Sequence, residues 1–445
     1  MKDKKTLIYI GITVVLLATL VGLWFLIVDT VNNSEVVESG EAPAIGSGAS
    51  VSYLAVKEIR ADETITSGEF ASANADENAI SASGNMTATL SGIKVTKTGD
   101  SEGGDNTSFY GTNSAILARG GANLTIKNAN IITDATGANG VFAYGGSATT
   151  NNASSDGTTI NIADSTIATS KDNSGGIMTT GGGTMNAENL TVTTAGTSSA
   201  AIRSDRGGGT VMVNKGTYKT TGKGSPAIYS TADITVKDAT LIATASEGAI
   251  IEGKNSITLE NVTLTDTNNA LNGQSTTYKN IFLYQSMSGD AVTGEAVFTA
   301  KNSTITTNKG DSFYVTNTTA EINLENNEIV NNDSTGNFLR IQKDSWGNSG
   351  NNGGTVTLNM NNQKATGNIV VDSISKLTMN LANSSSFSGV INGENVGEVG
   401  IVLDSSSSII LTGDTFIQSL TNADATNSNI HTNGYKLYVN GTLLK

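Results

Sequence analysis

The chain lacks cysteine altogether and has one histidine and two prolines among its 445 residues. The absence of cysteine excludes a disulfide framework, a zinc thiolate site and a thiol nucleophile. The single histidine, His431, lies near the C-terminus and gives no basis for a Ser-His-Asp triad or a multi-histidine metal site. Only 26 Lys and Arg stand against 40 Asp and Glu, so we expect no nucleic-acid partner.

Aromatic residues are also few, at 5% of the chain, and helical periodicity is nearly absent after the first 28 residues. The sequence is instead rich in Gly, Thr, Ser, Asn and Ala, with 50 glycines. This composition is typical of many short strands joined by turns.

One long apolar run does occur, over residues 6–28, with Lys2, Lys4 and Lys5 before it. Its 23 residues are enough to span a bilayer, and the lysines predict that the N-terminus faces the cytoplasm. We therefore expect a cytoplasmic tail at 1–5, an uncleaved transmembrane anchor at 6–28, a flexible linker at 29–50 and an N-terminal cap at 51–74. The predicted location is the cell membrane, as a single-pass protein with an extracellular C-terminal body.

Two short patterns alternate beyond residue 75. The first is a pair of small residues followed by an apolar one, which we expect to point inward: Ile80, Ile116, Val141, Ile177, Ile202, Ile228, Ile250, Phe282, Tyr314, Leu339, Val370 and Ile391. The second is apolar-x-apolar, with its second apolar position at Leu90, Ile126, Ile162, Ala187, Val213, Val236, Leu259, Ala300, Leu324, Met360, Leu381 and Leu403. Self-similarity at 25 or 26 residues indicates a solenoid.

A third pattern, TIAT, TVTT or TLTD, follows the second in the middle of the chain and gives three strands per coil. The predicted fold class is all-β, a right-handed parallel β-helix of about 12 coils over 75–411, with the N-terminal transmembrane helix and a C-terminal cap over 412–445. One turn carries Asn128, Asp164, Asn189, Asp238, Asn261, Asn302, Asn326, Asn362 and Asn383. Asn and Asp tolerate the left-handed conformation, and stacked amides can bond between coils.

These residues give the chain its resemblance to known proteins. The coils and the asparagine column resemble the pectin-lyase-like parallel β-helix superfamily. The blocks SGGIMTTGGG, AAIRSDRGGG and LYQSMSGDA make the chain similar to adhesin-like surface β-helix proteins. This resemblance, over roughly 75–445, implies a surface location and a binding role.

The candidate site is an outward-facing trough on the first strands. We expect the long turns at 145–157, 285–297 and 343–355 to project as walls, with a floor of four coils between the first two. The predicted floor residues are Met178, Arg203, Asp205, Arg206, Tyr229, Ile251, Glu252 and Lys254. A floor of this length suits an extended ligand, so the sequence predicts contact with cell-surface or extracellular glycans.

Three alternatives remain open from the sequence. In the plainest, Arg203 pairs with Asp205 as a solvated surface rung with no ligand. In the second, the trough belongs to a polysaccharide lyase or glycoside hydrolase, with Arg206 or Lys254 as base and Asp205 and Glu252 as carboxylates, although Glu252 occupies a predicted inward slot. In the third, outward threonine pairs such as Thr263 and Thr265 bind ice.

The preferred interpretation is an adhesin-like binding protein without catalysis, cofactor or metal. The run DSEGGDN at 100–106 lacks the spacing of a calcium-binding loop, and we expect it to be an exposed insertion.

Overall fold

We describe a computed structural model of the chain, covering residues 51–101, 103–146, 154–271 and 273–445. The chain divides into two compact units, Met1–Glu41 and Ala42–Lys445. The first unit lies outside the described residues, and so do the predicted tail, anchor and linker, which end at residue 50. The fold described below is that of the second unit.

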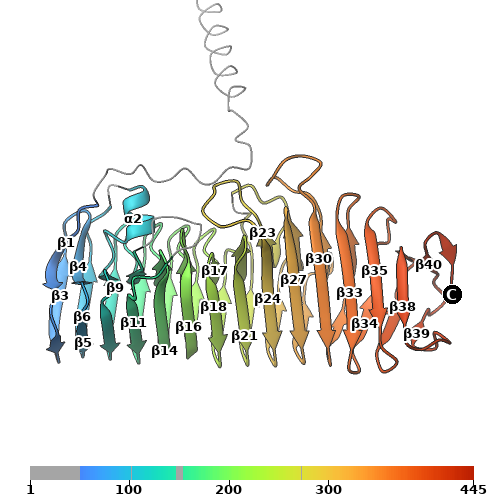
Figure 1. Cartoon of the computed structure of the whole chain (residues 1–445), viewed down its shortest axis with the longest axis horizontal. Coiled ribbons are helices and arrows are strands. Elements are labelled where there is room, and N and C mark those ends of the chain that lie inside the picture. Colours follow the sequence, from blue (N-terminus) through green and yellow to red (C-terminus); the bar gives the residue numbers. More distant parts are fainter. Residues whose placement is uncertain (1–50, 102, 147–153, 272) are drawn as a thin grey trace, which may run out of the picture. The chain divides into compact units, whose positions relative to one another are not determined.

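Parallel strands stacked in chain order form the body of this unit (Figure 1). The first strand of each coil contributes to a 12-stranded sheet, which we call sheet A. Its strands are β1 (Leu54–Ile59), β4 (Glu77–Ser83), β7 (Ile116–Arg119), β10 (Val141–Tyr144), β13 (Ile177–Thr180), β15 (Ile202–Ser204), β17 (Ile228–Ser230), β20 (Ala249–Glu252), β23 (Lys279–Tyr284), β26 (Asp311–Thr316), β29 (Leu339–Ile341) and β32 (Ile369–Val371).

The second and third strands of the coils form a 22-stranded sheet, sheet B. Its second-strand row contains β2 (Glu63–Ile65), β5 (Thr87–Ser91), β8 (Asn123–Lys127), β11 (Thr159–Ala163), β14 (Gly183–Thr194), β16 (Gly209–Thr220), β18 (Asp233–Lys237), β21 (Ser256–Glu260), β24 (Glu295–Lys301), β27 (Thr318–Glu325), β30 (Gly354–Asn361), β33 (Lys376–Ala382), β35 (Glu398–Leu403) and β38 (Ser419–Asn422). Its third-strand row contains β3 (Gly68–Ser72), β6 (Ile93–Lys97), β9 (Asn130–Thr133), β12 (Thr166–Thr169), β19 (Thr240–Ala243), β22 (Thr263–Asp266), β25 (Thr304–Thr307) and β28 (Glu328–Asn331). The long strands β14 and β16 pair in both rows.

Two small sheets complete the C-terminal coils. One contains β31 (Lys364–Thr366), β34 (Ser386–Gly389), β36 (Ser408–Leu411) and β39 (Ile430–His431). The other contains β37 (Thr415–Ile417), β40 (Leu437–Val439) and β41 (Thr442–Leu443), and β40 and β41 form an antiparallel hairpin within the predicted C-terminal cap. At the other end, β1, β2 and β3 of the predicted N-terminal cap pair in parallel with β4, β5 and β6.

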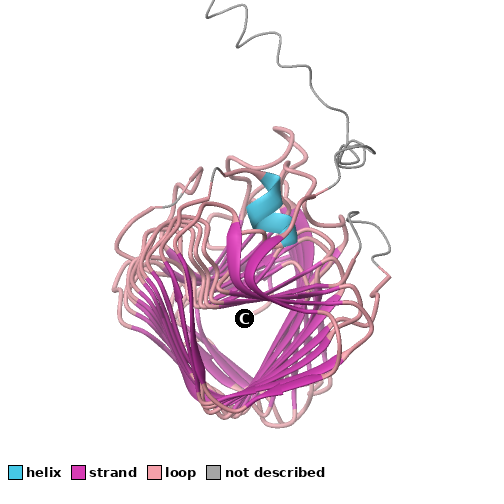
Figure 2. Cartoon of the chain, turned by 90° about the vertical axis from the view of Figure 1, so that its left-hand side faces the viewer, coloured by secondary structure: helices cyan, strands magenta, loops and turns pink. Residues whose placement is uncertain are grey.

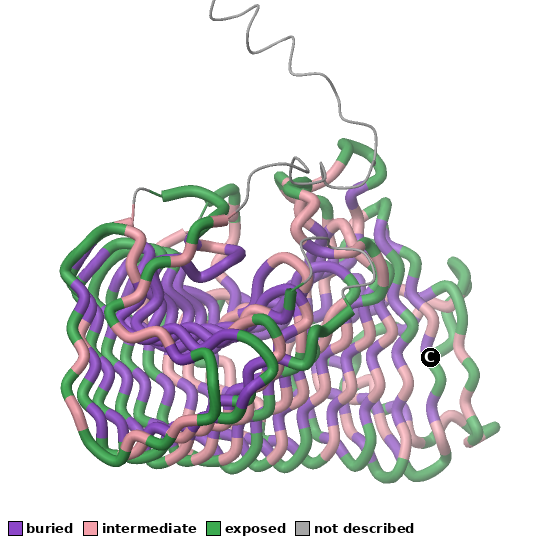
Figure 3. The backbone as a smooth tube through the Cα atoms, turned by 60° about the vertical axis from the view of Figure 1, so that its left-hand side comes forward, coloured by how far each residue is buried: buried purple, intermediate pink, exposed green. Residues whose placement is uncertain are grey.

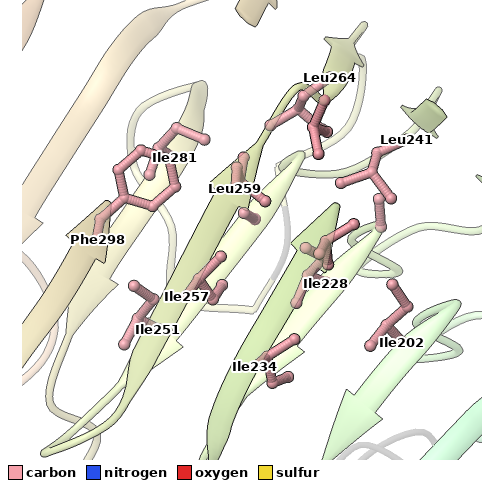
Figure 4. Packing of buried hydrophobic residues seen from close by; sticks show 14 of the residues in the cluster. Ile202, Ile228, Ile234, Leu241, Ile251, Ile257, Leu259, Leu264, Ile281 and Phe298 are labelled. Carbon is pink, nitrogen blue, oxygen red and sulfur yellow. The ribbon is translucent and has the colours of Figure 1, made fainter. Parts of the chain in front are cut away.

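The strands lie on three sides of an interior that apolar side chains fill (Figures 2 and 4). Each coil places its inward residues against those of the coils before and after it, as Ile202, Ile228 and Ile234 do. All 12 inward positions predicted from the second pattern, from Leu90 to Leu403, are in register with one another. These long parallel sheets fit a parallel β-helix.

The first pattern is wrong in four coils, by one residue each time. Ile228 pairs with Ala249, which pairs with Ile281, then Phe313, Leu339 and Ile369. The residues that we expected inward at these coils, Ile250, Phe282, Tyr314 and Val370, therefore point outward. A shift of one residue moves a strand's side chains to the opposite face. Adjacent apolar residues such as Ile250 and Ile251 left the sequence ambiguous, because sheet A is buried on both faces there.

The asparagine column behaves as predicted. All nine positions have positive φ, between 47° and 55°. Neighbouring coils are joined along it, since Asn189 Nδ2 donates to Asp164 Oδ1 at 2.7 Å and Asn326 Nδ2 donates to Asn302 Oδ1 at 2.8 Å. Lys215, with φ of 59°, interrupts the column between Asn189 and Asp238.

The predicted fold class needs correction at its helical part. Among the described residues, no helix has the length and apolar character needed to cross a membrane. The expected transmembrane helix at 6–28 lies outside these residues, so the fold class that the structure supports is all-β without it. The one helix of the described chain is α2 (Asp105–Tyr110), a six-residue helix on the outside of sheet A (Figure 2).

Candidate functional site

The outer face of sheet A is not open to solvent along its whole length, because two apolar clusters lie on it. Strands such as β13, β20 and β23 are buried along their whole length, whereas strands of sheet B alternate between buried and accessible residues (Figure 3). One apolar cluster on this outer face contains Leu117, Phe142 and Met178, with Tyr53 and Tyr144 against it. The other contains Ile250, Phe282, Tyr284 and Tyr314, with Tyr229 and Trp346 against it.

A polar cavity of about 330 Å³ lies on the outer side of β15, β17 and β20. We call it the acidic hollow, because its lining contains the carboxyl groups of Asp205, Glu252 and Asp290. The rest of the lining is Ser198, Ala200, Arg203, Gly224, Pro226, Tyr229, Tyr284, Ser286 and Ser288. Three carboxyl groups from three chain segments therefore face one space.

Arg203 and Asp205 form the first ion pair of the hollow. Strand alternation turns both side chains outward from β15, since Ile202 and Ser204 point inward. Arg203 Nη2 lies 2.9 Å from Asp205 Oδ2, and the backbone N–H of Arg206 donates to Asp205 Oδ1 at 2.9 Å. Burial raises the pKa of Asp205, while Arg203 acts in the opposite direction.

Arg206 connects the hollow to two insertions. Its Nε and Nη2 donate to Asp290 Oδ1 at 3.0 and 2.6 Å, which ties the 285–292 segment to the turn after β15. Its guanidinium lies 4.0 Å from the ring centroid of Phe109 on α2, and its Nη1 is 3.9 Å from Asp105. The described residues of the predicted exposed insertion, 100–101 and 103–106, are exposed or half-buried, and Phe109, which follows them, is buried beneath this contact.

Glu252 is the most enclosed acid of the hollow, at 2% exposure. Its Oε2 accepts hydrogen bonds from the hydroxyls of Tyr229 and Tyr284, the latter at 3.0 Å, and its Oε1 accepts one from Ser286. Burial raises the pKa of Glu252, although the hydroxyls of Ser286 and Tyr229 stabilise its charged form. The pKa of Tyr229 is raised well above its usual value, first by burial and then by Glu252.

The structure brings together five of the eight predicted floor residues. Arg203, Asp205, Tyr229 and Glu252 line the hollow, and Arg206 supports it from below α2. Glu252 was expected in an inward slot, and the corrected register turns it outward beside Tyr284.

The other three lie elsewhere. Met178 is fully buried in the cluster beneath α2, and Ile251 is fully buried in the interior (Figure 4). Lys254 is exposed and lines a separate cavity with Gly207, Gly208 and Gly209. The predicted floor was therefore too long, because apolar cover closes the face on both sides of the hollow.

The walls differ in part from the expectation. The 285–297 turn supplies Ser286, Ser288 and Asp290, and the 343–355 turn supplies Trp346. Most of the 145–157 turn lies outside the described residues. Tyr284 and Phe109 were not among the residues predicted from the sequence. A correct register would have found Tyr284, and the apolar pair in NTSFY was the signal for Phe109.

No protein-family model, curated protein sequence or solved structure matches this chain. The likeness to pectin-lyase-like and adhesin-like proteins therefore stays a prediction beyond the β-helical architecture. Among the described residues, no group of three or more His, Asp or Glu side chains is placed to hold a metal ion.

Proposed function

We propose that the acidic hollow binds a glycan and that the chain acts as an adhesin-like carbohydrate-binding protein. The observation that carries the proposal is the combination of carboxylates, an arginine and aromatic faces around one open cavity. Sugars present hydroxyl groups at their edges and C–H groups on their faces, so they need polar partners and flat apolar surfaces together. Asp205, Arg203 and Glu252 supply the former, and Tyr229 and Tyr284 supply the latter.

The proposal is tested with a glycan array. We expect the wild-type chain to bind a subset of glycans, and Tyr229→Ala and Arg203→Ala to lose that binding while the fold, measured by circular dichroism, is retained. Lys237→Ala is the matched control, because Lys237 lies on the exposed outer face of sheet B and pairs with Glu260. Equal binding by the wild type and both hollow variants would sink the proposal.

A second candidate function is hydrolysis of a glycosidic bond in the same hollow, which the three converging carboxyl groups favour. Asp205 and Glu252 belong to coils two apart, a backbone separation of about 10 Å, and both side chains line the hollow. Glu252, with its raised pKa, would protonate the leaving oxygen, and Asp205 would activate water.

The lyase variant has less support. Arg206 is held by Asp290 and Phe109, and Lys254 does not line the hollow, so neither is a free base there. Release of reducing ends from bound oligosaccharides tests hydrolysis. Loss of that release in Glu252→Gln, with binding retained, would support it, and bound oligosaccharides left intact by the wild type would exclude it.

A further inference from the structure

A second cavity of about 260 Å³ adjoins the acidic hollow, and the two share Gly224, Tyr229 and Tyr284 in their linings. We call it the aromatic recess, because Phe282 and Trp346 complete its ring-lined side. The ring of Trp346 lies 5.2 Å from those of both Phe282 and Tyr284. A polar cavity and an aromatic-lined cavity therefore lie next to each other, with Tyr229 and Tyr284 in the linings of both.

The charges of this site are unequally paired. Asp205 neutralises Arg203 at 2.9 Å, and Asp290 neutralises Arg206 at 2.6 Å. In the recess, Glu247 lies 3.8 Å from the ammonium group of Lys279. Among the described residues, no Lys or Arg forms an ion pair with Glu252, whose bonded partners are hydroxyl groups.

The same rings already accommodate an ammonium group. Lys279 Nζ lies 4.3 Å from the centroid of Phe282 and 5.7 Å from that of Trp346, on a lysine that is fully buried. Aromatic faces attract a cation most strongly when water is excluded. Phe282 and Trp346 are thus engaged by Lys279, and in the described part of the chain the group left without a cationic partner beside them is Glu252.

We propose that this site selects a glycan that carries an unacetylated amino sugar, with the sugar ammonium group beside Glu252 and a neighbouring ring on Trp346. This inference rests on the proposed function. An ammonium group gains a charge-assisted hydrogen bond to the ionised form of Glu252, which three hydroxyl donors also stabilise. A uronate or sulfate group meets Asp205, Glu252 and Asp290 with both arginines already engaged, so the site disfavours acidic polysaccharides.

The test compares glucosamine, N-acetylglucosamine and galacturonate tetramers by isothermal titration calorimetry at pH 6 and low salt. We expect the glucosamine tetramer to bind about tenfold more tightly than the acetylated one, and the galacturonate tetramer to bind most weakly. Glu252→Gln should abolish this preference, while Glu260→Gln on the outer face of sheet B should keep it. Trp346→Ala should weaken both glucosamine-based tetramers alike.

Two results would overturn the amino-sugar assignment while leaving the proposed function intact: galacturonate binding as tightly as glucosamine, or binding confined to unrelated neutral glycans. An unchanged preference in a folded Glu252→Gln variant would also overturn it. Absence of binding to every glycan on the array contradicts the proposed function itself.

Discussion

The outer faces of sheets A and B are built on the same inward packing but have different coverings. On sheet B, polar rows such as Asn161 and Asn186 pair with their counterparts one coil away and remain accessible. On sheet A, insertions bury the outer row, and ion pairs such as Arg206 with Asp290 connect residues 84 positions apart. This difference indicates that the repeated inward packing stabilises both sheets, whereas the insertions create the candidate site on sheet A alone.

Substitutions in the interior that the two sheets share should lower the free energy of unfolding most, and by similar amounts in both sheets. Ile228 in sheet A and Ile234 in sheet B belong to one coil and are both fully buried. We expect Ile228→Ala and Ile234→Ala each to lower the free energy of unfolding by about 2–4 kcal/mol, measured by urea denaturation. A large difference between the two variants would show that the covering of sheet A also changes the interior.

Removing an outer ion pair should destabilise the chain more on sheet A than on sheet B. Arg206→Ala leaves Asp290 without its partner in a partly enclosed position, and we expect a loss of about 2–3 kcal/mol. Limited proteolysis should also become faster within the 98–115 and 285–297 segments. Lys237→Ala, which removes the exposed pair with Glu260, should have no resolvable effect. Equal effects would mean that the insertions are not fastened through Arg206.

The buried acid Asp266 should make the stability of the chain depend on pH. Asp266 lies inward on β22 of sheet B, and burial raises its pKa from 3.8 to about 9. The folded state then holds a proton that the unfolded state releases, so stability falls as pH rises from about 4 to 9. Asp266→Asn should flatten this fall and stabilise the chain at pH 8 by about 1–3 kcal/mol, measured by thermal denaturation at several pH values.

This variant also distinguishes the interior from the hollow. Asp266→Asn should leave glycan binding unchanged, while Glu252→Gln changes it. The neighbouring coils place Ala243 and Thr307 in register with Asp266, so Asp266→Thr is a second variant suited to the site. Altered binding in both Asp266 variants would show that the interior acid acts on the hollow.

A smaller effect on stability should come from the asparagine column of sheet B. Asn326→Ala removes the bond to Asn302 and puts alanine, which tolerates the left-handed conformation less well than asparagine, at φ of 53°, for an expected loss of about 1–2 kcal/mol. Asn326→Gly keeps the conformation and should lose less. Neither variant should change glycan binding. If glycine were as harmful as alanine, the side-chain bond rather than the backbone would account for the position.

Much of the architecture could be predicted because each coil repeats the same packing. In the second strand, residues such as Leu90, Leu259 and Leu324 stand between polar neighbours, so alternation marked the inward face correctly. In the first strand, Ile250 and Ile251 are both buried, and periodicity alone could not separate the two faces. The candidate site is built on these same strands. The one-residue error in register therefore also placed Glu252 and Tyr284 on the wrong face.

Other parts of the site depended on contacts that no local pattern reveals. The pairing of Arg206 with Asp290 and Phe109 joins three segments far apart in the chain. The charge of Arg203 and Asp205 was visible in the sequence, but the cover that narrows the hollow to a few coils was not. Each insertion is a short local segment of the sequence, but its contacts are with residues far away in the chain. The sequence pattern therefore did not predict these contacts.

The contact between α2 and Arg206 also limits how this repeat can evolve. α2 emerges between β6 and β7, and Phe109 O accepts a hydrogen bond from Thr180 on β13 at 2.7 Å before the helix reaches Arg206 beyond β15. Duplication or loss of one coil between β7 and β15 would preserve the stacking of the solenoid. It would displace Phe109 from Arg206 by about 4.8 Å, one strand spacing. Coil number is free to vary near the C-terminal end, but between these strands it is fixed by the site.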